Sequence, residues 1–465
     1  MSIYRLFNHT YRDYVEDSEV LHLLNVIILS VAVGMFLFTA QSGVAFAGYA
    51  SALGAGEFAF GLISALPVLA GLLQIPASYM AEKTGKYKKM FMVGGVIQRL
   101  SWIAVAFIPY LFSVGESGLW ALIVLVTLAA MSGSFVAITH ITLMASVIPG
   151  AIRGRYITTR QRVCTISSMV AGLLIAFALD YIPGFAGYTV VFAIGGVAGL
   201  IDILMYARLR FRDIPSKPKD FSLLDGIKSS FKIPKTRDFL LFWAFWSFAV
   251  NISVPFFNKY AIDVLSLSYM SMIVFGQIVA QILTLIILSR WGVFLDRYGS
   301  VPVMMISACA STVGMVVWLW AVPGNVWPLF LFNFLGGLFW CANEATMVNM
   351  QLSHTPKYGR TAALAVYAVL TSGAAGIAFI IGGALLEALS PVVAGWELTF
   401  MGTPFDHYKL LFIITMLLRF IVIAIFLPRV WNEKGYGLRK AYTLAYQDMA
   451  TRLRYELSRI SFRKR

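Results

Sequence analysis

The sequence predicts an all-α, polytopic membrane protein with about twelve transmembrane helices. Its composition is the first observation: 59% of the 465 residues are hydrophobic and 13% are charged, whereas a soluble protein is about half apolar and about a quarter charged. The second observation is a series of apolar runs, each long enough to cross a bilayer, which takes about 20 residues per helix. Hydrocarbon offers no partner for backbone polar groups, so such runs must be helical. The composition argues against soluble, disordered and nucleic-acid-binding chains.

The apolar runs fall into two sets of six. They cover residues 22–48, 57–81, 89–112, 118–148, 160–182 and 186–209, then 237–262, 270–295, 301–322, 326–352, 361–388 and 407–428. We therefore predict a cytoplasmic N-terminal segment, a six-helix bundle, a basic cytoplasmic linker with some helix in it, a second six-helix bundle and a cytoplasmic basic tail. The boundaries of these five segments are 1–21, 22–209, 210–236, 237–428 and 429–465.

Lysine and arginine occur in alternate loops, which predicts the orientation of the chain. One set of loops holds Lys83, Lys86, Lys88, Lys89, Arg153, Arg155, Arg290, Arg297, Lys357 and Arg360. The opposite loops, such as "YASALGAGE" and "DYIPGFAGY", contain no base. Basic loops stay on the cytoplasmic side. We therefore expect a multi-pass protein of the cell membrane with both termini in the cytoplasm, and we assign the net charge of +15 to that membrane face.

The C-terminal tail carries an apolar stripe at three- and four-residue steps from Leu438 to Ile460, set among arginines and lysines. This spacing predicts an amphipathic helix on the anionic inner leaflet. A solvated basic tail is the alternative.

A charged motif occurs after the second apolar run of each set. It reads "MAEKTGKYKK" at 80–89 and "WGVFLDRYG" at 291–299. Aligning Glu82 with Asp296 also aligns Lys83 with Arg297 and Gly85 with Gly299. The chain therefore uses one six-helix unit twice, and such repeats commonly rock about a central binding site.

The second copy resembles the signature of the major facilitator superfamily, which has a glycine, three residues, an acid–base pair, one residue and a glycine. The matching positions are Gly292, Asp296, Arg297 and Gly299. The first copy departs from the signature at Ser78 and Glu82 but keeps its trailing bases. "RGRY" at 153–156 also resembles many bacterial members. The resemblance covers essentially the whole chain and implies a transporter, not an enzyme, without indicating its substrate.

The resemblance also implies a latch that closes the cytoplasmic side in one state and breaks in the other. The predicted latch residues are Glu82, Lys83, Gly85, Arg153, Arg155, Gly292, Asp296, Arg297, Gly299 and Arg360. Gly292 and Asp296 are four residues apart and share a helix face, where the carboxylate would meet a helix N-terminus or a base such as Arg360. A charged turn that only sets the topology is the alternative.

Glu344 is an ionisable residue midway along an apolar run, and such residues are functional candidates. Asn343 and Trp340 lie beside it in sequence or one turn away. In the superfamily helices 1, 4, 7 and 10 line the cavity, so the resemblance implies that Glu344 lies in the transport path. We expect a carboxylate buried in the membrane that carries the coupling proton. It would equally neutralise a cationic substrate, or pair structurally within the C-terminal half.

Amides and aromatic residues extend this predicted binding site. The substrate-binding candidates are Gln41, His140, Trp246, Asn251, Asn258, Gln277, Gln281, Trp340, Asn343 and Glu344. Their density suits a ligand with an apolar or ring-like face and hydrogen-bonding groups, although amides also join helices. Pro255 is expected to loosen the seventh helix. His140 would relay protons or serve as a packing residue.

Other charged residues in the apolar runs have structural explanations. Arg99 and Asp202 are expected to form a structural ion pair. Asp180, Asp263 and Glu387 lie near outer helix ends, where we expect them to be solvated. Arg419, on the twelfth run, has no obvious partner in the sequence.

The remaining motifs indicate neither an enzyme nor a metal site. The three cysteines, Cys164, Cys309 and Cys341, lie within apolar runs and lack metal-ligand spacing. We expect no cofactor and no metal, H⁺ as the coupling ion, a small-molecule substrate, contact with membrane lipids, no nucleic acid, and a monomer. An uncoupled facilitator and a lipid or lysolipid flippase of the same fold are the alternatives.

Overall fold

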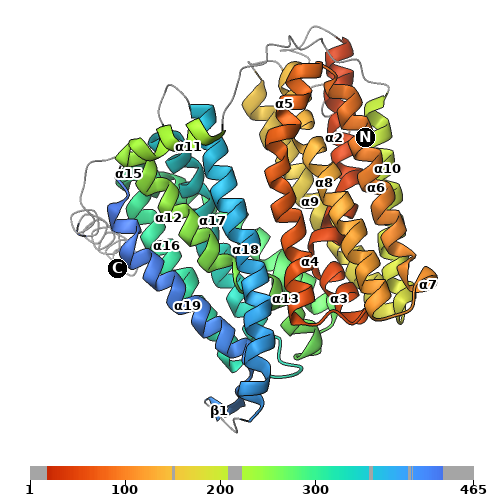
Figure 1. Cartoon of the computed structure of the whole chain (residues 1–465), viewed down its shortest axis with the longest axis vertical. Helices are drawn as coiled ribbons and strands as arrows, with labels where there is room; N and C mark the ends of the chain where they lie inside the picture. The colour runs from red at the N-terminus through yellow and green to blue at the C-terminus, as the bar shows by residue number, and fades with distance from the viewer. Residues whose placement is uncertain are drawn as a thin grey trace, which may run out of the picture.

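The structure, a computed structural model, describes residues 18–148, 152–207, 223–355, 360–395, 399–400, 402–432 and 443. Apart from residue 443, the predicted amphipathic tail lies outside the described residues, as do residues 1–17 of the N-terminal segment. The chain folds into two groups of helices that stand side by side (Figure 1).

The N-terminal group corresponds to the first six apolar runs. Its elements are α2 (Ser18–Ser42), α3 (Val44–Ala52), α4 (Glu57–Ala70), the 3₁₀ turn η1 (Gly71–Leu73), α5 (Gln74–Thr84), α6 (Tyr87–Ala106), α7 (Ile108–Leu111), α8 (Glu116–Val147), α9 (Arg153–Tyr181) and α10 (Phe185–Ala207). Within this group α6 packs on α8 and on α10, and α2 packs on α9 and on α10.

The C-terminal group corresponds to the second six runs. Its elements are α11 (Leu223–Lys232), α12 (Pro234–Asn251), α13 (Val254–Asp263), α14 (Tyr269–Ser271), the π-helix η2 (Met272–Ile278), α15 (Val279–Tyr298), α16 (Ser300–Gly314), η3 (Met315–Trp320), α17 (Trp327–His354), α18 (Arg360–Ala394), α19 (His407–Ile425) and η4 (Leu427–Arg429). A two-stranded hairpin, β1 (Thr399–Phe400) and β2 (Thr403–Pro404), precedes α19. The short helix α11 lies within the predicted linker and packs on α18.

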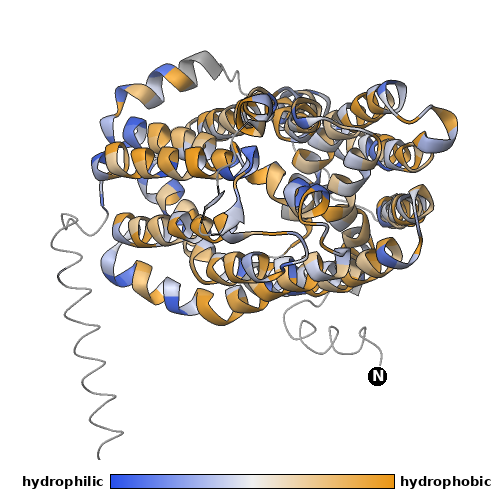
Figure 2. Cartoon of the chain, turned by 90° about the horizontal axis from the view of Figure 1, so that it is seen from below, coloured by the Kyte–Doolittle hydropathy of each residue, from blue (hydrophilic) through white to orange (hydrophobic). Residues whose placement is uncertain are grey.

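Membrane-spanning character is distributed over both groups. Among the described residues, 10 helical segments are long and apolar enough to cross a membrane. The segments α6 and α17 are not among these 10, since α6 carries Lys88, Lys89 and Arg99 and α17 is rich in amides. The predicted count of twelve is consistent with this result. Hydrophobic residues predominate along the helices of both groups (Figure 2), and many large hydrophobic side chains of both groups are exposed, as expected of surfaces that contact lipid.

Each copy of the charged motif ends its helix at a glycine with a positive φ. Gly85 ends α5 with φ 65° and Gly299 ends α15 with φ 87°. Glycine adopts positive φ without the penalty that a Cβ imposes. The two glycines thus occupy the same place in each repeat with a positive φ, but their ψ angles differ, 1° at Gly85 and 174° at Gly299, so the two turns are not identical.

Two of the predicted helices are broken partway along their length, where they face the other group. The first apolar run breaks at Gly43, between α2 and α3, and the seventh breaks at Ile252 and Ser253, between α12 and α13. Pro255 occupies the first turn of α13, where its missing N–H is tolerated. The expectation that Pro255 interrupts the seventh helix is confirmed.

The groups contact each other at one end and separate towards the other (Figure 1). At the contacting end α18 packs on α4, α13 on α3, and α14 on α9. The largest core cluster joins residues of both groups there, whereas two smaller clusters lie within the single groups. We call the contacting end the closed end. The opposite end, which carries α5 and α11, is the open end.

Candidate functional site

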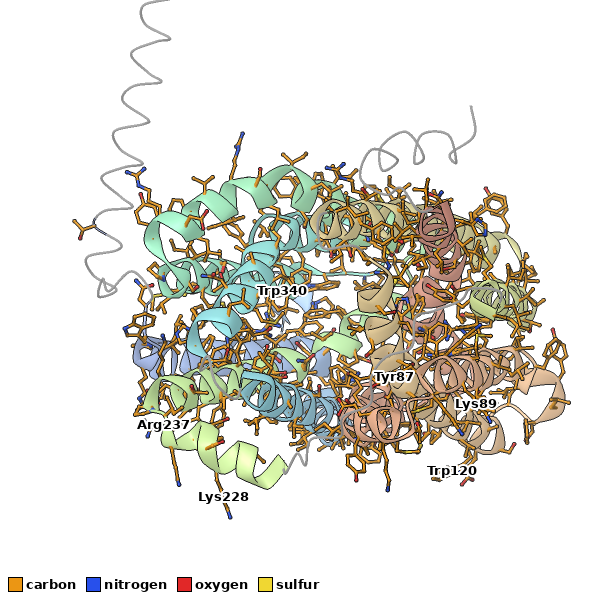
Figure 3. All side chains as sticks on the ribbon, turned by 90° about the horizontal axis from the view of Figure 1, so that it is seen from above. Tyr87, Lys89, Trp120, Lys228, Arg237 and Trp340 are labelled. Carbon is orange, nitrogen blue, oxygen red and sulfur yellow. The ribbon has the colours of Figure 1, made fainter. Side chains whose placement is uncertain are left out.

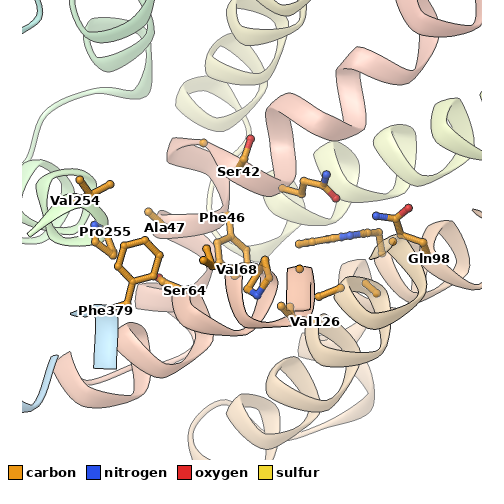
Figure 4. Close-up of a pocket in the computed structure, with 18 of the residues that line it drawn as sticks. Ser42, Phe46, Ala47, Ser64, Val68, Gln98, Val126, Val254, Pro255 and Phe379 are labelled. Atoms are coloured by element: carbon orange, nitrogen blue, oxygen red, sulfur yellow. The ribbon is translucent and has the colours of Figure 1, made fainter. Parts of the chain in front are cut away.

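Three adjoining cavities, of about 490, 1240 and 260 Å³, lie between the groups. The first two share Ser42, Gly43, Val254 and Asn258 in their walls, and the last two share Val250, Trp340 and Glu344. Because they share walls, we describe them together as the central cavity. Both groups line its first part (Figure 4), with Ser42, Phe46 and Gln98 from one group and Val254, Pro255 and Phe379 from the other.

Most of the predicted binding residues lie in the wall of this cavity. The residues found there are Gln41, Trp246, Asn251, Asn258, Gln277, Gln281, Trp340, Asn343 and Glu344. They come from broken or irregular segments as well as from the long helix α17. Figure 3, viewed from the open end, places Trp340 beside the space between the groups. The structure thus brings these side chains together, although their binding role stays a prediction.

Glu344 differs from the expectation of a buried carboxylate. Its side chain is exposed and lines two of the three cavities. Trp340 Nε1, one turn earlier on α17, donates a hydrogen bond to Glu344 Oε1 at 3.2 Å. Within the described part of the chain no base lies within ion-pair distance of Glu344. The carboxylate is therefore accessible to a ligand or a proton and is not held in a structural pair.

Several of the predicted amides already have protein partners. Asn251 Nδ2 donates to the Ser247 carbonyl at 2.7 Å, at the last turn of α12. Asn343 is 3% exposed, and its Oδ1 accepts a hydrogen bond from Ser307 at 2.6 Å. Gln277 Nε2 donates across the groups to Ser168 on α9 at 3.1 Å. These amides support the walls of the cavity, whereas Asn258 and Gln281 make no hydrogen bond through their amide groups to described residues and face the cavity.

His140 lies away from the central cavity, in a buried cluster of the N-terminal group. Its Nε2 is 3.1 Å from Tyr206 Oη, and its ring stacks on Phe91 at 5.7 Å. In the same cluster Arg99 Nη2 and Asp202 Oδ2 are 3.2 Å apart, which confirms the expected ion pair. The surroundings of His140 favour the packing role over contact with a substrate.

Part of the cavity wall consists of residues that were not predicted from the sequence. Gln74 from α5 and Gln98 and Trp102 from α6 line the first cavity. The superfamily pattern directs attention to helices 1, 4, 7 and 10, whereas α5 and α6 belong to the second and third runs. Gln98 and Trp102 are four residues apart in an apolar run. They therefore share a helix face, and this spacing could have indicated that the face lines the cavity.

The closed end is joined by polar contacts that the sequence did not predict. Asp180 on α9 accepts hydrogen bonds from the backbone N–H groups of Tyr269 and Met270, both at 2.9 Å. Asp263 on α13 accepts from Ser51 on α3 at 3.1 Å. Asp180 and Asp263 are exposed, as expected of solvated carboxylates, but each also bridges the two groups.

A lysine and a tyrosine add to this connection. Lys259 Nζ forms an ion pair with Asp263 at 2.6 Å and donates to the Ala55 carbonyl of the other group at 3.1 Å. Tyr408 Oη on α19 donates to Glu57 Oε1 on α4 at 2.6 Å. Together with the Asp180 and Asp263 contacts, these bonds tie the N-terminal group to three different segments of the C-terminal group.

Glycines allow the helices to approach closely at the same end. A Cβ added at Gly61 on α4 would lie 2.5 Å from the Phe379 carbonyl, and one at Gly383 on α18 would lie 2.7 Å from the Glu57 carbonyl. No real Cβ tolerates such distances, so α4 and α18 pack backbone to backbone. This packing requires small residues, as in other membrane helix pairs.

The predicted latch residues that the structure describes lie towards the open end. Lys83, Asp296 and Arg297 are exposed, and Glu82 is half-buried. A Cβ added at Gly292 would meet no atom of the described chain within 4 Å. The side chains of Arg153, Arg155 and Arg360 lie outside the described residues. Gly292 therefore faces open space here.

Comparisons with known proteins agree with this architecture. The nucleoside transporter NupG, solved as a point mutant, superimposes with a TM-score of 0.69 at 15% identity, covering 88% of this chain and all (100%) of that one. A bacterial homologue of the human lysosomal transporter Spinster gives 0.65 at 12% identity, covering 90% and 99%. The xylose transporter XylE from E. coli gives 0.61 at 13% identity, covering 89% and 99%. These identities establish a shared fold alone.

The sequence itself gives the family. It matches none of the curated proteins with which it was compared. The family model described as Major Facilitator Superfamily matches residues 26–291 and 279–441, which together include both helix groups and the charged motifs. The chain is a multi-pass membrane protein of the Major Facilitator Superfamily.

Proposed function

We propose that this protein is a secondary transporter that moves a small molecule through the central cavity by alternating access, coupled to protons through Glu344. Its family and fold support membrane transport. The single observation that carries the finer proposal is the asymmetry of the two ends. Backbone packing and charged contacts join the groups at one end, while the matched glycine at the other end faces open space.

This asymmetry supports one state of a two-state cycle. If the basic loops are cytoplasmic, the open end faces the cytoplasm and the conformation is inward-facing. Two of the similar structures are described as inward-facing or inward-open. In the opposite state Gly292 and Asp296 would approach the N-terminal group, and the contacts of Gly61 and Gly383 would separate. The charged motifs that end at Gly85 and Gly299 lie at matching places in the two repeats, and both would take part in that closure.

Glu344 is the best-placed residue for coupling in the central cavity. A carboxylate that is exposed in an inward-facing cavity is accessible to protons from the cytoplasm, and closure of the cavity would separate it from that compartment. A proton and a substrate that both bind the same state are thermodynamically linked, and each raises the affinity for the other.

The test uses the purified chain in proteoliposomes. A thermal-shift panel of sugars, nucleosides, amino acids and organic acids first identifies a stabilising solute, which is then assayed by uptake with an inward proton gradient and by counterflow without one. We expect accumulation with the gradient in the natural protein. The Glu344→Gln variant should lose accumulation but keep counterflow.

Two outcomes would contradict parts of this proposal. Accumulation that persists in Glu344→Gln would remove the coupling role from this carboxylate. Counterflow without any accumulation in the natural protein would instead identify an uncoupled facilitator. Asn333→Asp in the Glu344→Gln background adds a carboxylate elsewhere in the same cavity wall, and it serves as the control that charge in this wall alone does not restore coupling.

A further inference from the structure

Arg419 on α19 is a buried cation in the wall of the central cavity. It is 3% exposed, and it lines the largest of the three cavities together with Ser311, Asn333 and Glu344. The resemblance to the superfamily assigns it no role, and the sequence offers it no partner. Its position in the structure therefore requires an explanation from its surroundings.

The described protein supplies few hydrogen-bond acceptors and no countercharge for the Arg419 guanidinium. Nη2 donates to the Val250 carbonyl at 3.4 Å, one residue before the end of α12. Nε is buried and has no hydrogen-bond partner among the described residues. No carboxylate of the described chain lies within ion-pair distance. An arginine has five N–H donors, so most of its hydrogen-bonding capacity and its whole charge remain uncompensated.

The other buried arginine of the membrane region shows how the chain treats a structural cation. Arg99 is 2% exposed, and Asp202 neutralises it at 3.2 Å. A charge in the membrane interior is strongly unfavourable without a countercharge. Arg419 is equally buried but lies against a cavity instead of a carboxylate. The countercharge therefore has to come from whatever occupies the cavity.

The cavity that Arg419 lines also has an apolar surface. Phe257, Trp318 and Phe332 contact one another, with ring centroids 5.0 to 5.6 Å apart, and all three line the cavity. Glu344 shares the cavity, but no ion pair joins it to Arg419. The wall thus provides an apolar aromatic surface, a fixed positive group and a separate carboxylate.

We propose that Arg419 binds the anionic group, a carboxylate or a phosphate, of the transported molecule, whose apolar or aromatic body packs against Phe257, Trp318 and Phe332. This inference rests on the proposed transport function, because it names the substrate class of the same cavity. The guanidinium fork matches both anions through two parallel N–H···O bonds. A protonated Glu344 would leave the cavity neutral when the anion is bound, which fits co-transport of an acid with a proton.

Binding to the full-length chain in detergent tests the inference without a gradient. The probes are phenylacetate, phenyl phosphate and the neutral phenylacetamide, and the readout is the dependence of the unfolding temperature on probe concentration. We expect at least one anion to bind about tenfold more tightly than the amide, as charge-assisted hydrogen bonds require. The stronger of the two anions identifies the group. No preference for either anion over the amide would overturn the inference.

Substitutions at Arg419 test whether this residue causes the preference for the anion. Arg419→Gln should abolish the preference for the anion. Arg419→Lys keeps the charge but loses the planar fork of the guanidinium. It should bind the anion more weakly than the natural protein does and should bind the amide equally well. This variant replaces Arg419→Gln in the test if the glutamine variant fails to fold. Arg429→Gln makes the same change at an exposed arginine ten residues on, outside the central cavity, and should behave like the natural protein. An anion preference that survives in Arg419→Gln would show that Arg419 is only structural.

Failure of this inference and failure of the proposed function remain distinguishable. Binding in detergent needs neither a gradient nor a conformational cycle, so an uncoupled protein would still show the anion preference. Conversely, gradient-driven accumulation that depends on Glu344 would persist if the ligand proved neutral.

Discussion

The substitution Asp180→Asn tests the closed end most sharply. Asp180 accepts two backbone N–H bonds of 2.9 Å from the first turn of α14. A hydrogen bond to a charged group contributes about 1.5–3 kcal/mol, but the side chain is exposed, so solvent reduces this value. We therefore expect a loss of about 1–2 kcal/mol for the pair, since asparagine keeps the shape but loses the charge and one acceptor. This loss shifts the balance between the two states by about 5- to 30-fold.

The assay measures access to the cavity from the closed end. Ser42→Cys introduces a thiol at an exposed position in the wall shared by two cavities, in a background without Cys164, Cys309 and Cys341. A membrane-impermeant maleimide added on the closed-end side labels this thiol in proportion to the population that is open there. Asp180→Asn should raise the labelling rate by about 5- to 30-fold.

A matched control isolates the cross-group contact. Glu116→Gln neutralises another exposed carboxylate, in the first turn of α8, for which no bond to the other group occurs among the described residues. It should leave the labelling rate unchanged. If Asp180→Asn labels no faster than this control, the contact with α14 does not hold the closed end together.

Three further predictions follow from the packing. Gly61→Ala should raise closed-end labelling, because its Cβ would lie 2.5 Å from a carbonyl of the other group, whereas Gly336→Ala, which meets nothing within 4 Å, should not. Arg99→Met should lower the free energy of unfolding by about 3–5 kcal/mol, and the double variant with Asp202→Leu should recover most of this loss. Chemical denaturation measures both values, and equal stability of the single and double variants would contradict a buried pair. His140→Phe should retain gradient-driven uptake, since His140 packs on Phe91 and Tyr206, and a loss of coupling would restore the relay hypothesis.

The helical architecture follows closely from the sequence, because the bilayer sets the length of each apolar run. The breaks at Gly43 and Ser253 lie inside these runs. Pro255 indicated the second break, whereas a single glycine within an apolar run is equally compatible with close packing. Hydropathy alone also undervalues α6 and α17, since charges and amides that face the interior count against them.

The site could be predicted from the sequence only where a single polar or charged residue stands in an otherwise apolar run. Glu344 is a lone carboxylate in an apolar run, and the structure places it in the cavity wall. The bridging role of Asp180 was not predicted, because its partners are backbone N–H groups of a distant segment, which no side-chain pattern records. Arg419 had no account in the sequence for a related reason. Its neighbours are a carbonyl of α12 and an open cavity, and neither appears as a motif.

Alternating access is the central claim, and paired distances at the two ends test it most directly. Spin labels at Lys83 and Val293 report on the open end, and labels at Tyr181 and Trp327 report on the closed end, where all four positions are exposed. Double electron–electron resonance is measured on each pair with and without a transported solute. We predict that the open-end distance shortens in the same fraction of molecules in which the closed-end distance lengthens. Distances that stay fixed at both ends during transport would contradict the account.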